Sequence, residues 1–149
     1  MDRRFFEIIK TPYVSHSDAE TASLAGILAE RLEAGDIIAL TGNLGAGKTT
    51  FTKALAKALG IKSNVSSPTF NIVKEYRSGR LPLFHFDVYR LGSEEEFYDI
   101  GGEEYLFDSG VSVIEWADII AEALPVGTLF INIEYGNDEG ERIFSFAIK

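Results

Sequence analysis

The sequence predicts an α/β fold with a mostly parallel central sheet. Short apolar runs of strand length alternate with helical segments over the first two-thirds of the chain, which is typical of this class. The run at 36–41, DIIALT, is apolar at nearly every position, as in parallel strands that are buried on both faces. The chain has 149 residues and no internal repeat, so we expect a single domain over 1–149.

The N-terminal part is expected to hold a strand, a helix and a second, buried strand. RFFEIIK at 4–10 is predicted to be the first strand. A helix should follow from a cap at Ser17 or Asp18, because apolar residues then recur at helical spacing until Gly35 ends the pattern. The buried strand at 36–41 comes directly after this glycine.

The remaining elements follow from the same two periodicities. A second helix is predicted at 48–60, where Gly60 ends it. Three apolar runs are strand candidates, at 69–77, 81–89 and 111–116. The runs at 128–135 and 142–149 are separated by the turn sequence GNDEGE, and we expect this hairpin to add antiparallel edge strands to the sheet.

The charge balance argues against direct binding of nucleic acid. The chain carries 23 acidic and 14 basic residues, a net charge of −9 at pH 7, without a clustered run of lysine and arginine. Cysteine is absent, which removes disulfides and thiolate metal sites and agrees with a reducing compartment. No apolar run is long enough to span a bilayer. We therefore expect a cytoplasmic protein.

A glycine-rich turn joins the strand at 36–41 to the helix at 48–60. Residues 42–49, GNLGAGKT, fit the phosphate-binding pattern G-x-x-x-x-G-K-[S/T]. The glycines let successive backbone N–H groups face phosphate oxygens, and the helix N-terminus adds its positive dipole. Lys48 is predicted to reach the β- and γ-phosphates, and the Thr49 hydroxyl to bind Mg²⁺. The fold prediction thus becomes a P-loop NTPase-like three-layer sandwich.

Phosphoryl transfer also needs a carboxylate at the end of a neighbouring strand. Asp87 ends the apolar run LFHFD, and Glu115 ends VSVIE. Glu115 follows the more continuous run, which suits a central strand beside the P-loop strand. Asp87 is expected either to orient the attacking water or to bind Mg²⁺ through water. The alternative for both residues is a solvated carboxylate at a strand end.

Four other features each allow two interpretations. The hydroxyl-rich loop around Pro68 is placed where P-loop proteins keep a nucleotide-sensing switch, but an ordinary Ser-Pro turn fits equally well. Trp116 is either a core residue or part of the catalytic loop. Arg142 contacts either a phosphate or base, or an acid on the surface. His85 has no metal-spaced companion, so metal binding is not expected there.

Four blocks of sequence together resemble a known family. They are GNLGAGKTTF, VSSPTF, HFDVYRL and IEWAD, and in this order and spacing they are similar to TsaE (formerly YjeE), the bacterial ATPase of tRNA threonylcarbamoyladenosine biosynthesis. The resemblance runs from the first helix to the terminal hairpin. It implies a small ATPase that uses ATP and Mg²⁺ and works with the proteins TsaB and TsaD. The complex modifies adenosine 37 of tRNA, which this chain would meet only indirectly.

The resemblance also implies residue roles. Lys48, Asp87, Glu115 and Trp116 would be catalytic, and Thr49 and Glu115 would hold Mg²⁺. The implied nucleotide-binding residues are Asp18, Thr21, Asn43, Leu44, Gly45, Ala46, Gly47, Lys48, Thr49, Thr50, Asp87 and Arg142, with Asp18, Thr21 and Arg142 around the base. The implied switch-like loop contains Ser66, Pro68 and Thr69. Asn43 stands where the family commonly has aspartate.

Three other functions compete with this one. A small-molecule or nucleotide kinase usually needs an arginine-rich lid, and the chain has seven arginines without a cluster. A GTPase needs the guanine-reading segment N-K-x-D, which is absent. A module whose bound nucleotide only regulates assembly would carry the same residues, and the sequence does not separate it from a slow ATPase.

Overall fold

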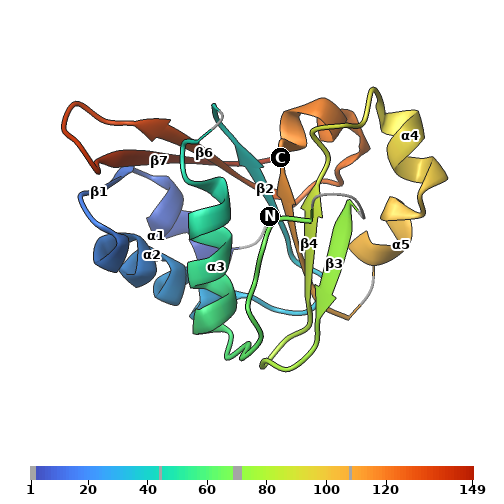
Figure 1. Ribbon diagram of the computed structural model, residues 1–149, viewed down its shortest axis with the longest axis horizontal. Helices are drawn as coiled ribbons and strands as arrows, with labels where there is room; N and C mark the ends of the chain where they lie inside the picture. Colours follow the sequence, from blue (N-terminus) through green and yellow to red (C-terminus); the bar gives the residue numbers. More distant parts are fainter. Residues whose placement is uncertain (1–2, 44, 69–71, 108) are drawn as a thin grey trace.

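The computed structural model describes residues 3–43, 45–68, 72–107 and 109–149, and within these ranges a seven-stranded sheet crosses the molecule (Figure 1). The strand order is β1-β7-β6-β2-β5-β4-β3. The strands are β1 (Tyr13–Ser15), β2 (Ile37–Thr41), β3 (Val73–Tyr76), β4 (Leu83–Asp87), β5 (Val111–Glu115), β6 (Leu129–Tyr135) and β7 (Arg142–Ile148). Strands β4, β5, β2 and β6 are parallel, which confirms the predicted parallel centre.

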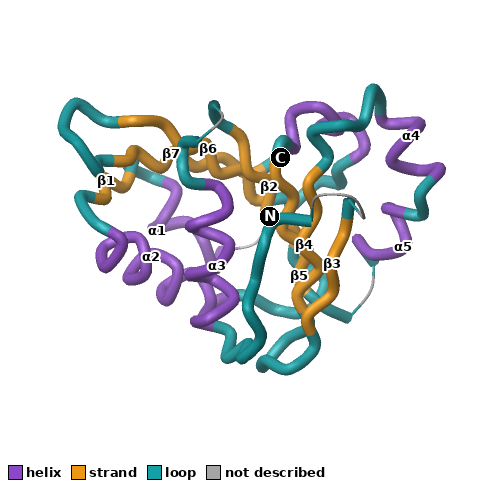
Figure 2. The backbone as a smooth tube through the Cα atoms, in the orientation of Figure 1, coloured by secondary structure: helices purple, strands orange, loops and turns teal. Residues whose placement is uncertain are grey.

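Helices cover both faces of this sheet. They are α1 (Phe6–Ile9), α2 (Asp18–Arg31), α3 (Lys48–Ala58), α4 (Glu94–Asp99) and α5 (Gly102–Leu106), with 3-10 helices η1 (Arg3–Phe5) and η2 (Ala117–Ala123). Figure 2 shows α1, α2 and α3 grouped on one side of the sheet and α4 and α5 on the other. The three-layer α/β architecture is therefore confirmed.

Strand β2 contributes side chains to a hydrophobic core on each face of the sheet. Its residues Ile38 and Leu40 pack with α2 and α3 in one core, and Ile37 and Ala39 pack in the other with residues of α4, α5 and η2. Both faces of β2 are buried because its side chains alternate between the two helical layers. This is the structural reason for the continuous apolar run.

The predicted strand at 4–10 is wrong, because this segment is helical. Phe5, Ile8 and Ile9 are spaced i, i+3, i+4 and pack together against the core on the α2–α3 side of the sheet. The Arg4 guanidinium donates to the Arg31 carbonyl at the end of α2 and to the Asp36 carboxylate. The segment therefore packs on the helical layer, and the first strand is β1, which follows it in the sequence.

Other boundaries shift without changing the architecture. Helix α2 ends at Arg31, before Gly35, which occupies the following turn with φ of +92°. The C-terminal hairpin adds the antiparallel strand β7 as predicted, and the short β1 pairs outside it and takes the edge position. The predicted strand at 69–77 is seen as β3 from Val73, and residues 69–71 lie outside the described residues. Within the described ranges, the helices are too short or too polar to cross a membrane.

The topology brings three strand ends to one edge of the sheet. Leu40 of β2 is paired with Glu115 of β5, and Glu115 is paired with Asp87 of β4. The loop after β2 leads directly into α3, where Gly47 has φ of +108° as the residue before the helix. Parallel strands present their carboxyl ends together, so the phosphate loop and both predicted carboxylates lie side by side.

Candidate active site

Lys48 is held inside the phosphate loop. Its side chain starts at the first residue of α3 and is 5% exposed. The ammonium Nζ donates to the carbonyl oxygens of Gly42 at 2.8 Å and Asn43 at 2.9 Å. It also lies 3.9 Å from the centre of the Trp116 ring, within the range of a cation–π interaction. The loop thus keeps a positive charge at the place where the motif predicts phosphates.

This environment changes the acidity of Lys48. Burial lowers the pKa of its ammonium below the ordinary value of 10.5, because the charged form is poorly solvated there. The carboxylates of Glu115, Asp118 and Asp87 act in the opposite direction and offset part of this effect. The lysine is therefore a buried cation that negative charge would stabilise further.

At position 42, the loop has room for a glycine but not for a residue with a side chain. A Cβ atom on Gly42 would lie 2.2 Å from the carbonyl oxygen of Ile133 in β6, and Gly42 has φ of +130°. Both the contact and the dihedral angle exclude other residues. The first glycine of the motif is thus required by the neighbouring strand as well as by the turn.

Thr49 and Glu115 meet where the metal site was predicted. The Thr49 hydroxyl donates to Oε1 of Glu115 at 3.0 Å and to Oε2 at 3.2 Å. Glu115 is 3% exposed at the end of β5. No group of three or more His, Asp or Glu side chains suited to a metal occurs among the described residues. A hydroxyl and one carboxylate nevertheless suit Mg²⁺, which commonly binds to one or two carboxylates together with phosphate oxygens.

His85 is a site residue that the sequence did not reveal. It is fully buried in β4, and its Nε2 lies 2.5 Å from Oε2 of Glu115. Its Nδ1 is also buried and has no hydrogen-bond partner among the described residues. The available signal was the spacing of His85 and Asp87, which places both side chains on one face of β4.

Asp87 is fixed by two hydrogen bonds beside the phosphate loop. Its Oδ2 accepts from the Ser67 hydroxyl at 3.2 Å, and its Oδ1 accepts from the backbone N–H of Tyr89 at 3.0 Å. Ser67 belongs to the hydroxyl-rich loop, so this loop does reach the site. Ser66 is instead bonded to Lys74, whose Nζ donates to its hydroxyl at 2.8 Å.

Trp116 packs partly in the core and partly against Lys48, and its catalytic role stays a prediction. Its ring packs against the core on the η2 side of the sheet and also faces Lys48. The Tyr89 ring lies against it, tilted by 51°, with ring centres 4.8 Å apart. Trp116 has φ of +62°, a left-handed conformation that costs a non-glycine residue roughly 1–2 kcal/mol. Such strain is often found at functional sites, and here it turns the indole towards the lysine.

These side chains line one pocket of about 280 Å³. Its lining consists of Gly45, Gly47, Lys48, Thr49, Thr50, Ser67, Asp87, Glu115 and Trp116. All four predicted catalytic residues and both predicted metal ligands are therefore in one place. The predicted residues Leu44 and Thr69 lie outside the described residues.

A smaller hollow of about 140 Å³ adjoins this pocket and shares Gly45, Gly47 and Thr50 with it. It is lined by Ser17, Asp18, Thr21, Gly45, Ala46, Gly47, Thr50, Gly140, Arg142 and Phe144. Arg142 donates from Nε to the Ala46 carbonyl at 3.1 Å, and its guanidinium lies 4.5 Å from the centre of the Tyr135 ring. Asp18, Thr21 and Arg142 thus line one hollow beside the phosphate loop, and their place around the base stays a prediction.

Fold and site together place the molecule in the P-loop NTPase fold class, with the loop between β2 and α3 and carboxylates at the ends of β5 and β4. The model of the family described as Threonylcarbamoyl adenosine biosynthesis protein TsaE matches residues 15–144. The chain belongs to this family.

Individual relatives agree over most of their length. The chain is 50% identical over 127 residues to the tRNA threonylcarbamoyladenosine biosynthesis protein TsaE of Bacillus subtilis, covering 85% of this chain and 79% of that one. It is 44% identical over 130 residues to the protein of that name from Treponema pallidum, covering 87% and 96%. The crystal structure of Bacillus subtilis YdiB is similar, with a TM-score of 0.79 and 39% identity over 93% of this chain and 86% of that chain.

Proposed function

We propose that this protein is a Mg²⁺-dependent ATPase that serves the biosynthesis of N6-threonylcarbamoyladenosine in tRNA. The family and the names of its relatives support the pathway. The observation that carries the ATPase activity is the pocket in which Lys48, Thr49, Asp87 and Glu115 converge. A lysine, a hydroxyl and two carboxylates from three separate strand ends are the groups that phosphoryl transfer requires.

ATP would bind with its phosphates along the loop. Lys48 would exchange the carbonyls of Gly42 and Asn43 for β- and γ-phosphate oxygens, which are stronger partners because they are charged. The N-terminus of α3 would add its dipole at the same place. Asp18, Thr21 and Arg142 would face the nucleoside from the smaller hollow.

Thr49 and Glu115 would hold Mg²⁺ next to these phosphates. The bound ion would neutralise charge on the β- and γ-oxygens. His85 would keep the Glu115 carboxylate in its position through the bond to Oε2. A carboxylate that is fixed by such a hydrogen bond can present an oriented oxygen to the metal ion.

Hydrolysis would proceed by in-line attack of water on the γ-phosphorus. A new P–O bond forms to the water oxygen, the bond to the β–γ bridging oxygen breaks, and the products are ADP and inorganic phosphate. Lys48 would stabilise the charge that develops on the leaving side. Asp87 would orient the water with a carboxylate that Ser67 and Tyr89 already fix, or would hold a water of the metal.

TsaB and TsaD would be the partners, and ATP hydrolysis would reset or activate their complex. The net charge of −9 supports contact with tRNA through the complex and not by this chain directly. We expect weak activity of the isolated chain, because the loop containing Ser67 helps to position Asp87 and would be ordered further by a partner.

The test of the catalytic proposal is release of ADP by the isolated chain with Mg²⁺ and without any acceptor molecule. Slow release that disappears in Lys48→Ala supports an ATPase. ADP release that requires an added acceptor would indicate a small kinase instead. Tight ATP binding with no hydrolysis, alone or with TsaB and TsaD, would indicate a module that nucleotide only regulates.

A further inference from the structure

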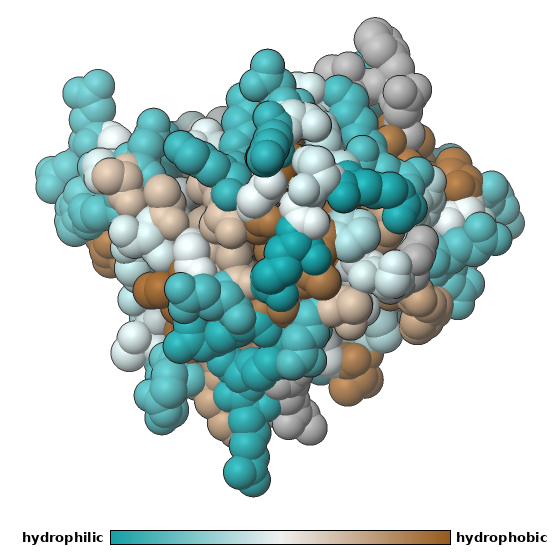
Figure 3. Space-filling view, turned by 90° about the horizontal axis from the view of Figure 1, so that it is seen from below, coloured by the Kyte–Doolittle hydropathy of each residue, from teal (hydrophilic) through white to brown (hydrophobic). Residues whose placement is uncertain are grey.

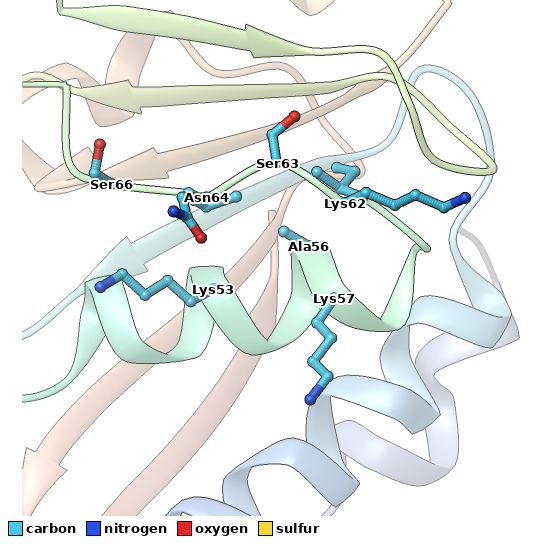
Figure 4. A pocket seen from close by; sticks show the side chains of 9 residues that line it. Lys53, Ala56, Lys57, Lys62, Ser63, Asn64 and Ser66 are labelled. Atoms are coloured by element: carbon cyan, nitrogen blue, oxygen red, sulfur yellow. The ribbon is translucent and has the colours of Figure 1, made fainter.

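A second hollow follows the C-terminal half of α3, away from the phosphate pocket. It measures about 540 Å³, close to twice the volume of that pocket, and runs between the helix and the segment 61–66. Figure 4 shows this segment passing over the helix, with Asn64 directed towards it. The lining residues are Lys53, Ala56, Lys57, Ile61, Lys62, Ser63, Asn64, Val65 and Ser66. We call this hollow the α3 groove.

The α3 groove has an apolar floor and a basic rim. Ala56, Ile61 and Val65 are buried beneath it, with exposed fractions of 1%, 7% and 9%. Lys53, Lys57 and Lys62 are exposed around it, and its lining contains no acidic residue. This composition is unusual in a chain with 23 acidic and 14 basic residues. Seen from below, the molecule carries many hydrophilic side chains with smaller hydrophobic areas between them (Figure 3).

The three lysines have no partner within the part of the chain that the structure describes. The side chains of all three make no hydrogen bond, ion pair or cation–π contact there, although the backbone N–H of Lys62 donates to the Ser78 hydroxyl at 3.3 Å. Figure 4 shows that they do not converge: Lys53 extends towards the start of α3, Lys62 towards the opposite end, and Lys57 away from the segment 62–66. The three lysines are attached at separate places along the α3 groove, which fits an elongated anion better than a single phosphate.

We propose that the α3 groove binds an extended acidic segment of a partner protein. Lys53 and Lys57 are one helical turn apart, about 6 Å along the axis. Alternate residues of an extended chain are spaced by about 6.6 Å, so two carboxylates of such a segment match the two lysines. Apolar side chains of the same segment would contact only the small exposed parts of Ile61 and Val65, so charge would supply most of the affinity. The free lysines change orientation at the cost of side-chain entropy alone.

A nucleic acid fits the same groove less well. Among its lining residues there is no arginine for bidentate contacts with phosphate and no aromatic side chain for stacking on bases. A net charge of −9 also repels a polyanion at longer range. An acidic peptide carries far fewer charges than a nucleic acid and is repelled less.

A partner segment bound in the α3 groove would be linked to the phosphate site by two structural elements. The segment that forms its upper wall continues into Ser67, whose hydroxyl donates to Asp87 at 3.2 Å. Its lower wall is α3, the helix that begins with Lys48 in the phosphate loop. A partner bound here would therefore fix the loop that positions Asp87. This inference rests on the proposed partnership with TsaB and TsaD.

The experiment compares affinity for the TsaB–TsaD pair between the wild-type chain and the double variant Lys53→Glu/Lys57→Glu. We expect the variant to bind at least about tenfold more weakly at low salt, and its affinity to depend less on salt, because two attractive charges become repulsive. ATP affinity of the isolated variant should stay within about twofold of wild type, which also shows that it is folded.

The matched control is Arg3→Glu/Lys10→Glu, which changes the net charge equally at exposed positions outside the α3 groove. Equal weakening in both variants, or in neither, would overturn the groove as the docking site. Direct tRNA binding by the wild-type chain that only the groove variant loses would replace the acidic partner with nucleic acid. Failure of wild type to bind TsaB–TsaD, despite ATP hydrolysis, would refute the proposed partnership and this inference together.

Discussion

His85 and Glu115 form a buried hydrogen-bonded pair between β4 and β5, with Nε2 and Oε2 2.5 Å apart. The register of the two strands creates the pair: Asp87 is opposite Glu115, so His85 is the diagonal neighbour of Glu115 on the same face. Thr49 bonds the same carboxylate from the phosphate loop. The Glu115 carboxylate is thus hydrogen-bonded both to His85 of β4 and to Thr49 of the phosphate loop.

Replacement of His85 should affect the metal more than the nucleotide. His85→Ala removes the bond that orients Glu115, and we expect the turnover of ATP to fall about 10–100-fold, with a higher Mg²⁺ concentration for half-maximal rate. His85→Gln retains an N–H that reaches a similar position and should recover part of the activity. Titration of the rate with Mg²⁺ checks this. Equal loss in both variants with an unchanged Mg²⁺ requirement would show that His85 only fills space.

Replacement of Lys48 should weaken ATP binding but leave the stability of the fold nearly unchanged. Lys48→Met keeps the apolar stem and removes the ammonium, so ATP affinity should fall by about 10–100-fold, as for the loss of a hydrogen bond to a charged group. The nucleotide-free variant should unfold at nearly the wild-type temperature, because removal of a poorly solvated charge offsets two lost hydrogen bonds. Calorimetric binding and thermal unfolding test this. A large fall in melting temperature would contradict it.

The lowered pKa of Lys48 predicts a pH effect on ATP binding. Bound phosphates favour the protonated ammonium, so the affinity should fall as the pH rises through the lowered pKa, beginning below the ordinary lysine value of 10.5. Binding should take up protons in this range, which calorimetry in two alkaline buffers of different ionisation enthalpy detects. Lys48→Arg, which stays charged, should bind ATP without that uptake.

The lowered pKa of Lys48 also predicts how the free energy of unfolding changes with pH. The unfolded chain holds the Lys48 proton up to a higher pH than the folded chain does. The contribution of this group to the free energy of unfolding therefore rises with pH through the lowered pKa, and is constant above 10.5. Lys48→Met should remove this part of the pH dependence in denaturant unfolding of the nucleotide-free protein.

The two carboxylates should respond differently to neutralisation. Glu115→Gln should reduce turnover and raise the required Mg²⁺ concentration, with a smaller effect on ATP affinity, because it removes a charge from the metal site. Asp87→Asn should reduce turnover at an unchanged Mg²⁺ requirement if Asp87 orients the attacking water. A shift in that requirement would instead assign Asp87 to a water of the metal. Ser67→Ala, which removes one bond to Asp87, should show a weaker form of the Asp87→Asn effect.

The P-loop part of the site was predictable because it is local in sequence. A buried strand, the motif at 42–49 and a helix follow each other directly, and strand-end positions identified Glu115 and Asp87. These signals depend only on the periodicity of neighbouring residues. The structure confirms their placement in one pocket.

The remaining features depend on contacts that sequence spacing does not encode. The bond from Arg142 to Ala46 joins residues 96 positions apart, and the His85–Glu115 pair depends on strand register. The segment 4–10 is apolar at spacings that fit a helix or a strand, and the helix is the form in which Phe5, Ile8 and Ile9 all pack against the core. The α3 groove arises from the path of 61–66 over the helix, which no motif marks.

The most direct test of the account is the rate of ATP hydrolysis with and without TsaB–TsaD, using Lys48→Ala as the reference for no activity. We expect slow, Mg²⁺-dependent hydrolysis by the isolated chain and clear stimulation by the partner pair, abolished in Lys48→Ala. A rate that the partner pair leaves unchanged, or one that Lys48→Ala retains, would contradict a partner-driven ATPase at this site.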